Sequence, residues 1–260
     1  MDSTEYKKSY QVEETHWWYR GQRHLISRFF YRHFSGQRDL TILDVGCGTG
    51  FNMGAIESFG SVYGIDISDD AITYCKKRGC KVLKASVETL PFSDNSFDAV
   101  TSMGVFYHNG VVDDLQGMRE IMRVLKPQGR LLFFDSAMRC LTGNHDIVFH
   151  GVRRYEKAEL LLKLQEAGCI VNRISYVFVL LFPLVYGKRK LDTLLSVRPK
   201  SEVVMTSRII NRILSMYCRL DEFFAQVIHY PFGLNIVAWA EKPDPLMRPV
   251  SQRGENENSF

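Results

Sequence analysis

Residues 40–50, with the sequence LTILDVGCGTG, decide how this chain folds. The first six of these residues are mostly apolar, which predicts a short buried strand. Gly46, Gly48 and Gly50 follow at alternate positions, and glycine lets a backbone turn tightly and approach a ligand that a Cβ would exclude. A helix N-terminus with free N–H groups is expected next. The alternative is a strand turn without a ligand.

The residues around this turn indicate which classes of ligand it can bind. A dinucleotide fingerprint, G-x-G-x-x-G, needs a third glycine where this chain has Phe51. Asp44 would repel a pyrophosphate but suits a cationic ammonium group. Asp66 ends the second expected strand and can accept hydrogen bonds from both hydroxyls of a ribose, although it would also serve as a helix cap. The pattern predicts a nucleoside that carries an ammonium group.

From residue 39 to residue 175, apolar runs alternate with helical patterns, as in βαβ units with a parallel sheet. The expected strands are residues 40–45, 62–67, 81–85, 97–102, 131–135, 169–179 and 234–240, and the expected helices are residues 19–34, 114–125 and 157–167. Pro127 and Gly129 end the second of these helices. The predicted fold is α/β: a Rossmann-like, seven-stranded, doubly wound sheet, mostly parallel with an antiparallel last strand, plus helical cap elements.

These motifs resemble the class I S-adenosylmethionine-dependent methyltransferase superfamily. Residues 85–92 (ASVETLPF) look like its third segment, where an acidic residue usually holds the adenine amino group and this chain has Ser86. Residues 97–100 (FDAV) and 123–130 (RVLKPQGR) also match. The resemblance implies S-adenosylmethionine as cofactor and residues 39–175 as the domain that binds it. The implied cofactor-binding residues are Asp44, Gly46, Cys47, Gly48, Gly50, Asp66, Ile67, Ser86, Val87 and Met103.

A narrower resemblance links the chain to small bacterial methyltransferases of the type 11-like group. Its marks are residues 14–21 (ETHWWYRG), 145–146, 153–155 and 231–233 (PFG), and they imply a reaction class without a substrate. Residues 1–38 are interpreted as an N-terminal helical lid. Trp17, Trp18 and Tyr19 would then exclude water and face the sulfonium, or else only anchor a helix.

The acceptor side offers two candidate general bases, His145 and His108. A histidine of near-neutral pKa can take a proton from an attacking hydroxyl, and the adjacent Asp146 could orient His145. Structural histidines are the alternative for both. His145, Asp146 and His150 are also possible metal ligands, but neighbouring residues converge poorly on one ion, so no metal is predicted.

The expected reaction is methylation of a small-molecule hydroxyl on a secondary metabolite, sugar or lipid. The segment after the fourth strand, residues 103–108, lacks the Asn/Asp-Pro-Pro-aromatic motif of many nucleic-acid amino methyltransferases. A net charge of +4 is also small for a nucleic-acid partner, so none is predicted. The alternatives are C- or N-methylation, aminopropyl transfer, and a protein that binds the cofactor without catalysis.

Composition favours a cytoplasmic protein. The six cysteines form no C-x-x-C pair, and the polar start has no signal-peptide core. The longest apolar run, residues 174–186, contains Pro183 and is too short to span a membrane.

Residues 176–242 are predicted to form a cap insertion and the final strand. Apolar residues from Ile209 to Ile228 follow helical spacing, and they either wall the acceptor pocket or pack as an ordinary helix. A third interpretation is an interfacial helix, since the apolar residues 178–186 precede Lys188, Arg189 and Lys190, so peripheral membrane contact is an open possibility. Residues 243–260 are predicted to be a disordered tail. The oligomeric state is not predicted.

Overall fold

A computed structural model of the chain describes residues 3–198, 207–225 and 227–245. Its centre is a seven-stranded sheet. The strands are β1 (Leu40–Val45), β2 (Gly60–Asp66), β3 (Lys81–Lys84), β4 (Phe97–Met103), β5 (Leu125–Ser136), β6 (Ile170–Val177) and β7 (Asn235–Glu241). Their order is β3-β2-β1-β4-β5-β7-β6, and β7 runs antiparallel to both of its neighbours while all other pairs are parallel. The predicted fold class is confirmed.

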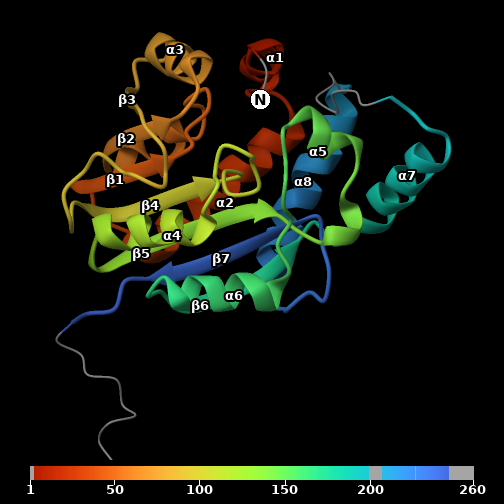
Figure 1. The fold of residues 1–260 in the computed structure, drawn as a ribbon. Coiled ribbons are helices and arrows are strands. Elements are labelled where there is room, and N and C mark those ends of the chain that lie inside the picture. The colour runs from red at the N-terminus through yellow and green to blue at the C-terminus, as the bar shows by residue number, and fades with distance from the viewer. Residues whose placement is uncertain (1–2, 199–206, 226, 246–260) are drawn as a thin grey trace, which may run out of the picture.

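Helices cover both faces of this sheet (Figure 1). They are α1 (Ser3–Val12), α2 (Trp17–Phe34), α3 (Asp69–Lys77), α4 (Asp114–Val124), α5 (Asn144–Val148), α6 (Lys157–Glu166), α7 (Phe182–Leu194) and α8 (Arg208–Ala225), with short 3-10 turns η1 (Met53–Ala55), η2 (Glu57–Phe59) and η3 (Arg139–Leu141). α4 and α6 pack on one face, and α2 and α8 pack on the other. The predicted disordered tail lies mostly outside the described residues.

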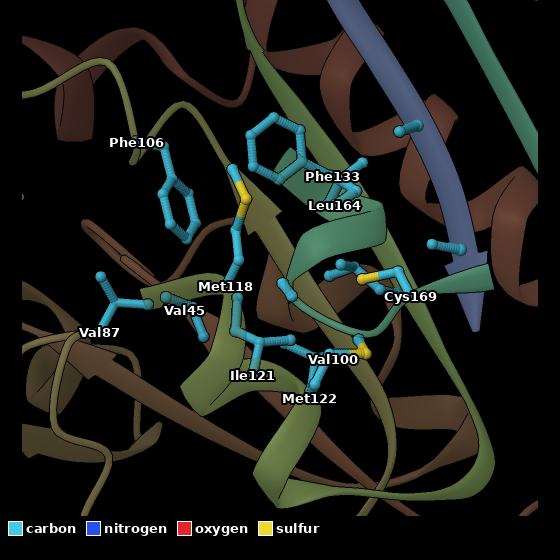
Figure 2. Close-up of a cluster of buried hydrophobic side chains, with 14 of the residues drawn as sticks. Val45, Val87, Val100, Phe106, Met118, Ile121, Met122, Phe133, Leu164 and Cys169 are labelled. Carbon is cyan, nitrogen blue, oxygen red and sulfur yellow. The ribbon is translucent and has the colours of Figure 1, made fainter. Parts of the chain in front are cut away.

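The sheet is buried on both sides because neighbouring strand residues point in opposite directions. In β5, Phe133 joins the core under α4 and α6, whereas Leu132 and Phe134 join the core under α2. Figure 2 shows the first core, where Met118 of α4 lies beside Phe133. Burial on both faces explains why these strands appear in the sequence as continuous apolar runs.

β1 marks the point where the chain reverses its direction across the sheet. It pairs with β2 on one side and with β4 on the other. In open sheets of this kind, ligands bind outside the carboxyl ends of the strands at such a reversal. The turn at Gly46, Gly48 and Gly50 lies there, and all three glycines have positive φ angles of 66°, 55° and 80°. Residues with a Cβ rarely adopt this conformation.

The helix expected directly after this turn is not present. Residues 51–59 form η1 and η2 instead, and β2 begins at Gly60. Nine residues are too few for a full-length helix and the return to the sheet, and Gly54 in their middle disfavours a helix. β5 also begins at Leu125, earlier than predicted, because Leu125 already pairs with Phe97 before a register shift.

α8 packs in the opposite sense from the prediction. Its buried residues are small or polar: Ser215, Cys218, Asp221, Glu222 and Ala225. An added Cβ on Gly21 of α2 would lie 3.3 Å from the Cβ of Cys218, so the two helices meet closely at a glycine. Asp221 accepts hydrogen bonds from the N–H groups of Phe178 and Val179. The apolar residues of α8 therefore face away from the sheet.

We expect Glu222→Gln to flatten the pH dependence of stability. Glu222 is 1% exposed and pairs with Nδ1 of His24 at 2.8 Å, and burial raises its pKa to about 7. The folded carboxyl therefore holds its proton more tightly than the unfolded one, so Glu222 lowers the unfolding free energy as pH rises from about 4.5 to 7. The Glu222→Gln variant lacks this pH-dependent loss of unfolding free energy, which is on the order of 1–3 kcal/mol.

Urea denaturation at pH 5 and pH 8 measures this effect. Glu166→Gln is the matched control, because Glu166 is exposed and pairs only with Arg119. An unchanged difference between the two pH values in Glu222→Gln would contradict the expectation.

Candidate active site

A cavity of about 420 Å³ lies at the carboxyl ends of the central strands. It falls within the usual size range of small-molecule sites. Part of its lining comes from the ends of β1, β2, β4 and β5 and the segments that follow them. The first helices form another wall, which consists of Tyr6, Ser9, Glu13, His16, Trp17, Trp18, Tyr19 and Gln22.

The glycine turn forms the floor of one end of this cavity. An added Cβ on Gly46 would lie 2.3 Å from the Val105 side chain, so no larger residue fits there. Gly48 lines the cavity, and an added Cβ on it would meet no protein atom within 4 Å. A side chain at Gly48 would therefore occupy space that a ligand can use.

Asp66 lies beside the turn with its carboxylate at the cavity wall. The residue is 8% exposed, and its two oxygens accept hydrogen bonds from the N–H groups of Gly48 at 3.0 Å and Ser68 at 2.9 Å. Burial raises the pKa of Asp66, and these two hydrogen bonds oppose the rise. A carboxylate has about four acceptor positions, so each oxygen can accept one more hydrogen bond. This arrangement suits two neighbouring hydroxyls, such as those of a ribose.

The segment after β3 extends the cavity on the same side. Ser86 and Val87 of this segment line the cavity, together with Ile67, which follows β2. The Ser86 hydroxyl accepts a hydrogen bond from the N–H of Glu88 at 3.2 Å, which leaves its own O–H to donate. Apolar side chains beside a hydroxyl donor suit a planar base with ring nitrogens.

Two residues predicted to bind the cofactor do not line the cavity. Asp44 is buried behind the turn, where it accepts a hydrogen bond from the Thr101 hydroxyl at 2.6 Å and burial raises its pKa to about 7. Asp44 does not face the cavity, so its contact with an ammonium group stays a prediction. Gly50 has a packing role, because an added Cβ would lie 2.8 Å from the sulfur of Cys80. The remaining predicted residues, Gly46, Cys47, Gly48, Asp66, Ile67, Ser86, Val87 and Met103, line the cavity.

Both candidate bases line the cavity, and their surroundings differ. Nδ1 of His108 accepts a hydrogen bond from the N–H of Gly110 at 2.9 Å, and burial lowers the pKa of His108 to about 4. A neutral imidazole that accepts at Nδ1 carries its proton on Nε2. His108 is therefore arranged to donate a hydrogen bond rather than to take a proton.

His145 lies in the first turn of α5, where its ring packs on Phe149 with ring centroids 4.5 Å apart. Asp146 does not orient this ring, contrary to the prediction. Its carboxylate accepts a hydrogen bond from the N–H of Gly143 and pairs with Arg154 at 2.7 Å. Successive residues of a helix point about 100° apart, so His145 and Asp146 contact different parts of the protein.

Several cavity residues were not predicted individually. Glu13 is buried, accepts a hydrogen bond from the Thr49 hydroxyl at 2.5 Å and pairs with Arg78, so it ties α1 to the glycine turn. Trp18, which was predicted with Trp17 and Tyr19 to belong to a lid, packs on Phe178 with ring centroids 5.1 Å apart. The motif at residues 14–21 indicated this segment, but nothing local in the sequence shows that Glu13 reaches across to Thr49.

Two further arginines line the cavity beside His145. They are Arg154, which the sequence indicated only as part of a motif, and Arg189 of α7. Val185, one helical turn before Arg189, also lines the cavity, so α7 forms part of the wall. None of the α8 residues does, and the prediction that the apolar positions of α8 wall the pocket is wrong.

Within residues 3–198, 207–225 and 227–245, no group of three histidine, cysteine or acidic side chains lies close enough to hold a metal ion. No helix in this part of the chain combines the length and apolar content needed to cross a membrane.

The chain is similar to several known methyltransferases. Residues 43–133 match the family described as methyltransferase domain. The chain is 31% identical over 129 residues to probable tRNA methyltransferase 9B of Mus musculus, which covers 49% of this chain and 26% of that protein. It is 31% identical over 149 residues to 24-methylenesterol C-methyltransferase 2 of Oryza sativa subsp. japonica, covering 52% and 40%. The chain thus spans less than half the length of either relative.

Among solved structures, geranyl diphosphate C-methyltransferase from Streptomyces coelicolor A3(2), bound to S-adenosyl-L-homocysteine, has a similar fold. The TM-score is 0.55 at 18% identity, and the similarity covers 83% of this chain and 76% of that one. Residues 43–133 therefore form a methyltransferase domain, and the chain shares the fold of S-adenosylmethionine-dependent methyltransferases. The open space at Gly48 and the two remaining acceptor positions of Asp66 fit the cofactor of this class.

We expect Asp66→Asn to weaken binding of S-adenosylhomocysteine at least about tenfold, the equivalent of ~1.4 kcal/mol. The substitution removes the negative charge and one of the two acceptor oxygens that would face the ribose. Isothermal titration calorimetry measures the change. Asp69→Asn is the control, because Asp69 pairs with Lys84 at the protein surface and does not line the cavity.

Thermal unfolding must show that Asp66→Asn is folded, since Asp66 also holds two backbone N–H groups. Equal affinity in a folded Asp66→Asn variant and in the unmodified protein would contradict the assignment.

Proposed function

We propose that the protein transfers a methyl group from S-adenosylmethionine to a small-molecule acceptor. The observation that carries this proposal is one continuous cavity whose lining includes both Asp66 and His145. Asp66 offers acceptors for a ribose, and the same lining contains a histidine and apolar side chains. A cofactor and a second molecule can therefore meet inside one enclosure.

The cofactor supplies an electrophilic methyl group on a sulfonium. The chain itself positions the reactants and excludes water, which together lower the barrier of a displacement reaction. Asp66 and Gly48 would hold the nucleoside, with Ser86 and Val87 beside the base. Trp17 and Trp18 line the cavity, and aromatic faces can attract a cation and shield it from solvent.

His145 is the base that this geometry favours for a hydroxyl acceptor. It would take the hydroxyl proton as the oxygen attacks, while His108 would donate a hydrogen bond from Nε2. Tyr107 also lines the cavity, and burial raises its pKa, so its hydroxyl remains a donor near neutral pH. Methylation of a carbon is the second candidate reaction, because the rice relative is named a C-methyltransferase.

A transfer assay with His145→Asn tests the proposed role of the base. Removal of a general base slows a reaction typically about 10²–10⁴-fold. We expect a loss in this range for release of S-adenosylhomocysteine with hydroxyl acceptors, while the affinity for S-adenosylhomocysteine stays unchanged. His229→Asn is the control, since His229 is exposed and does not line the cavity.

Full activity in His145→Asn would exclude His145 as the base and favour a carbon acceptor or transfer by proximity alone. Binding of the cofactor without transfer to any acceptor would instead indicate a non-catalytic binding protein. A cytoplasmic location remains a prediction.

A further inference from the structure

The outer face of α8 carries a row of exposed apolar side chains. They repeat at alternating spacings of four and three residues, which places them on one side of the helix: Ile209, Ile213, Met216, Leu220 and Phe223. This set is termed the α8 stripe. Its exposed fractions run from 49% to 73%, and at the rise of an α-helix the row is about 21 Å long. A continuous exposed apolar surface of this kind marks an interaction site.

Polar contacts on the opposite side of α8 keep the stripe facing outward. Asp221 accepts hydrogen bonds from the N–H groups of Phe178 and Val179. Glu222 pairs with Nδ1 of His24 at 2.8 Å. A rotation of α8 that buried the stripe would break both sets of contacts, and the loss of a partner by a buried carboxylate costs free energy. The outward direction of the stripe is therefore built into the packing of the helix.

Arginines lie along one flank of the stripe. Three of them belong to α8 and are exposed: Arg208, Arg212 and Arg219. Each precedes a stripe residue by one position, which puts it about 100° around the helix from that residue. A fourth arginine, Arg28 of α2, lies over Phe223 with its Cζ atom 5.4 Å from the ring centroid.

The acidic residues of α8 do not share this surface. They are Asp221 and Glu222, and both are buried. The exposed surface of α8 therefore combines apolar and cationic side chains without a carboxylate.

The other flank of the stripe is apolar. Ile210 and Phe224 each follow a stripe residue by one position, and they are 49% and 45% exposed. Tyr217 lies on the same flank, and its hydroxyl accepts a hydrogen bond from the N–H of Leu180 at 3.1 Å. Leu180 is 67% exposed and belongs to the segment for which the sequence allowed membrane contact. The apolar surface of α8 thus adjoins the segment that leads into α7.

We propose that the α8 stripe docks on an anionic lipid surface. A bilayer offers both partners that this face requires, because its interior takes up apolar side chains and its anionic headgroups attract arginines. A helix with these two features lies in the plane of the interface, so α8 would lie along the membrane surface without crossing it. This proposal does not depend on the proposed methyl transfer.

Two other occupants would match only one of the two features. A second copy of the chain would cover the apolar side chains, but it would bring a second set of arginines and no exposed carboxylate from α8. A nucleic acid would pair its phosphates with the arginines, but it would leave the apolar side chains in water. Charge complementarity and burial together therefore favour the bilayer.

Flotation of the full-length protein with vesicles tests this proposal. We expect binding to vesicles of equimolar phosphatidylglycerol and phosphatidylcholine, and at least about tenfold weaker binding to phosphatidylcholine alone. Two double variants separate the apolar contribution from the cationic one. Each should weaken binding to the mixed vesicles at least about tenfold: Ile213→Glu/Phe223→Glu and Arg212→Glu/Arg219→Glu.

Each double variant has a control that changes the charge by the same amount elsewhere on the surface. Leu83→Glu/Leu162→Glu replaces apolar residues of β3 and α6 that are 49% and 66% exposed. Lys76→Glu/Arg119→Glu reverses the charge of exposed residues of α3 and α4. Both controls should retain binding to the mixed vesicles, because screening limits the effect of a charge to its surroundings.

Thermal unfolding and the affinity for S-adenosylhomocysteine should be unchanged in the stripe and arginine variants, since none of the four replaced residues lines the cavity. Equal binding of the unmodified protein to both vesicle types would overturn the proposal. Undiminished binding of either double variant would do the same.

The two other occupants would give distinct results, and each would also overturn the proposal. A second copy would appear as a dimer in analytical ultracentrifugation that Ile213→Glu/Phe223→Glu abolishes, without vesicle binding. A nucleic acid would appear as binding of a mixed RNA that Arg212→Glu/Arg219→Glu alone abolishes, again without vesicle binding.

Discussion

The hydrogen bond between the Gly48 N–H and the Asp66 carboxylate is the contact on which the rest of the site depends. It joins the turn after β1 to the end of β2 and so fixes the two sides of the nucleoside end. Because the N–H of Gly48 is used within the protein, the turn does not present it to a phosphate. The acceptor positions that remain on Asp66 favour hydroxyls, which separates this site from the phosphate-binding turns of dinucleotide folds.

Much of the fold was predictable because its signals are local. Strands buried on both faces appear as continuous apolar runs, and β1 was predicted at its observed bounds. α4 and α6 were predicted within one residue, since each buries one apolar stripe against the sheet. α8 shows the same spacing but exposes that stripe, because its polar residues find partners in His24 and in the backbone of Phe178. Periodicity identifies a helix, but it does not show which face is buried.

Different parts of the cavity lining also differ in how far the sequence predicts them. The part of the lining that would hold the nucleoside consists of short motifs, so its residues and the turns that position them are close in sequence. The rest of the lining is assembled from the N-terminal helices, the segments after β4 and β5, and α7. Arg154 and Arg189 are 35 residues apart, so their shared carboxylate, Asp146, could not be inferred from spacing. The displacement of Asp44 from the cavity was equally hidden, because it depends on the cross-strand partner Thr101.

The wall that α1 and α2 form has a practical consequence for work with shortened proteins. A fragment that begins at β1 would retain the glycine turn and Asp66. It would lack Glu13, whose carboxylate joins Thr49 to Arg78, and the paired indoles beside the cavity. Without these residues, one wall of the cavity would be missing and the cavity would be open to bulk water. Binding studies on such a fragment would describe a wetter and weaker site than the one the intact polypeptide encloses.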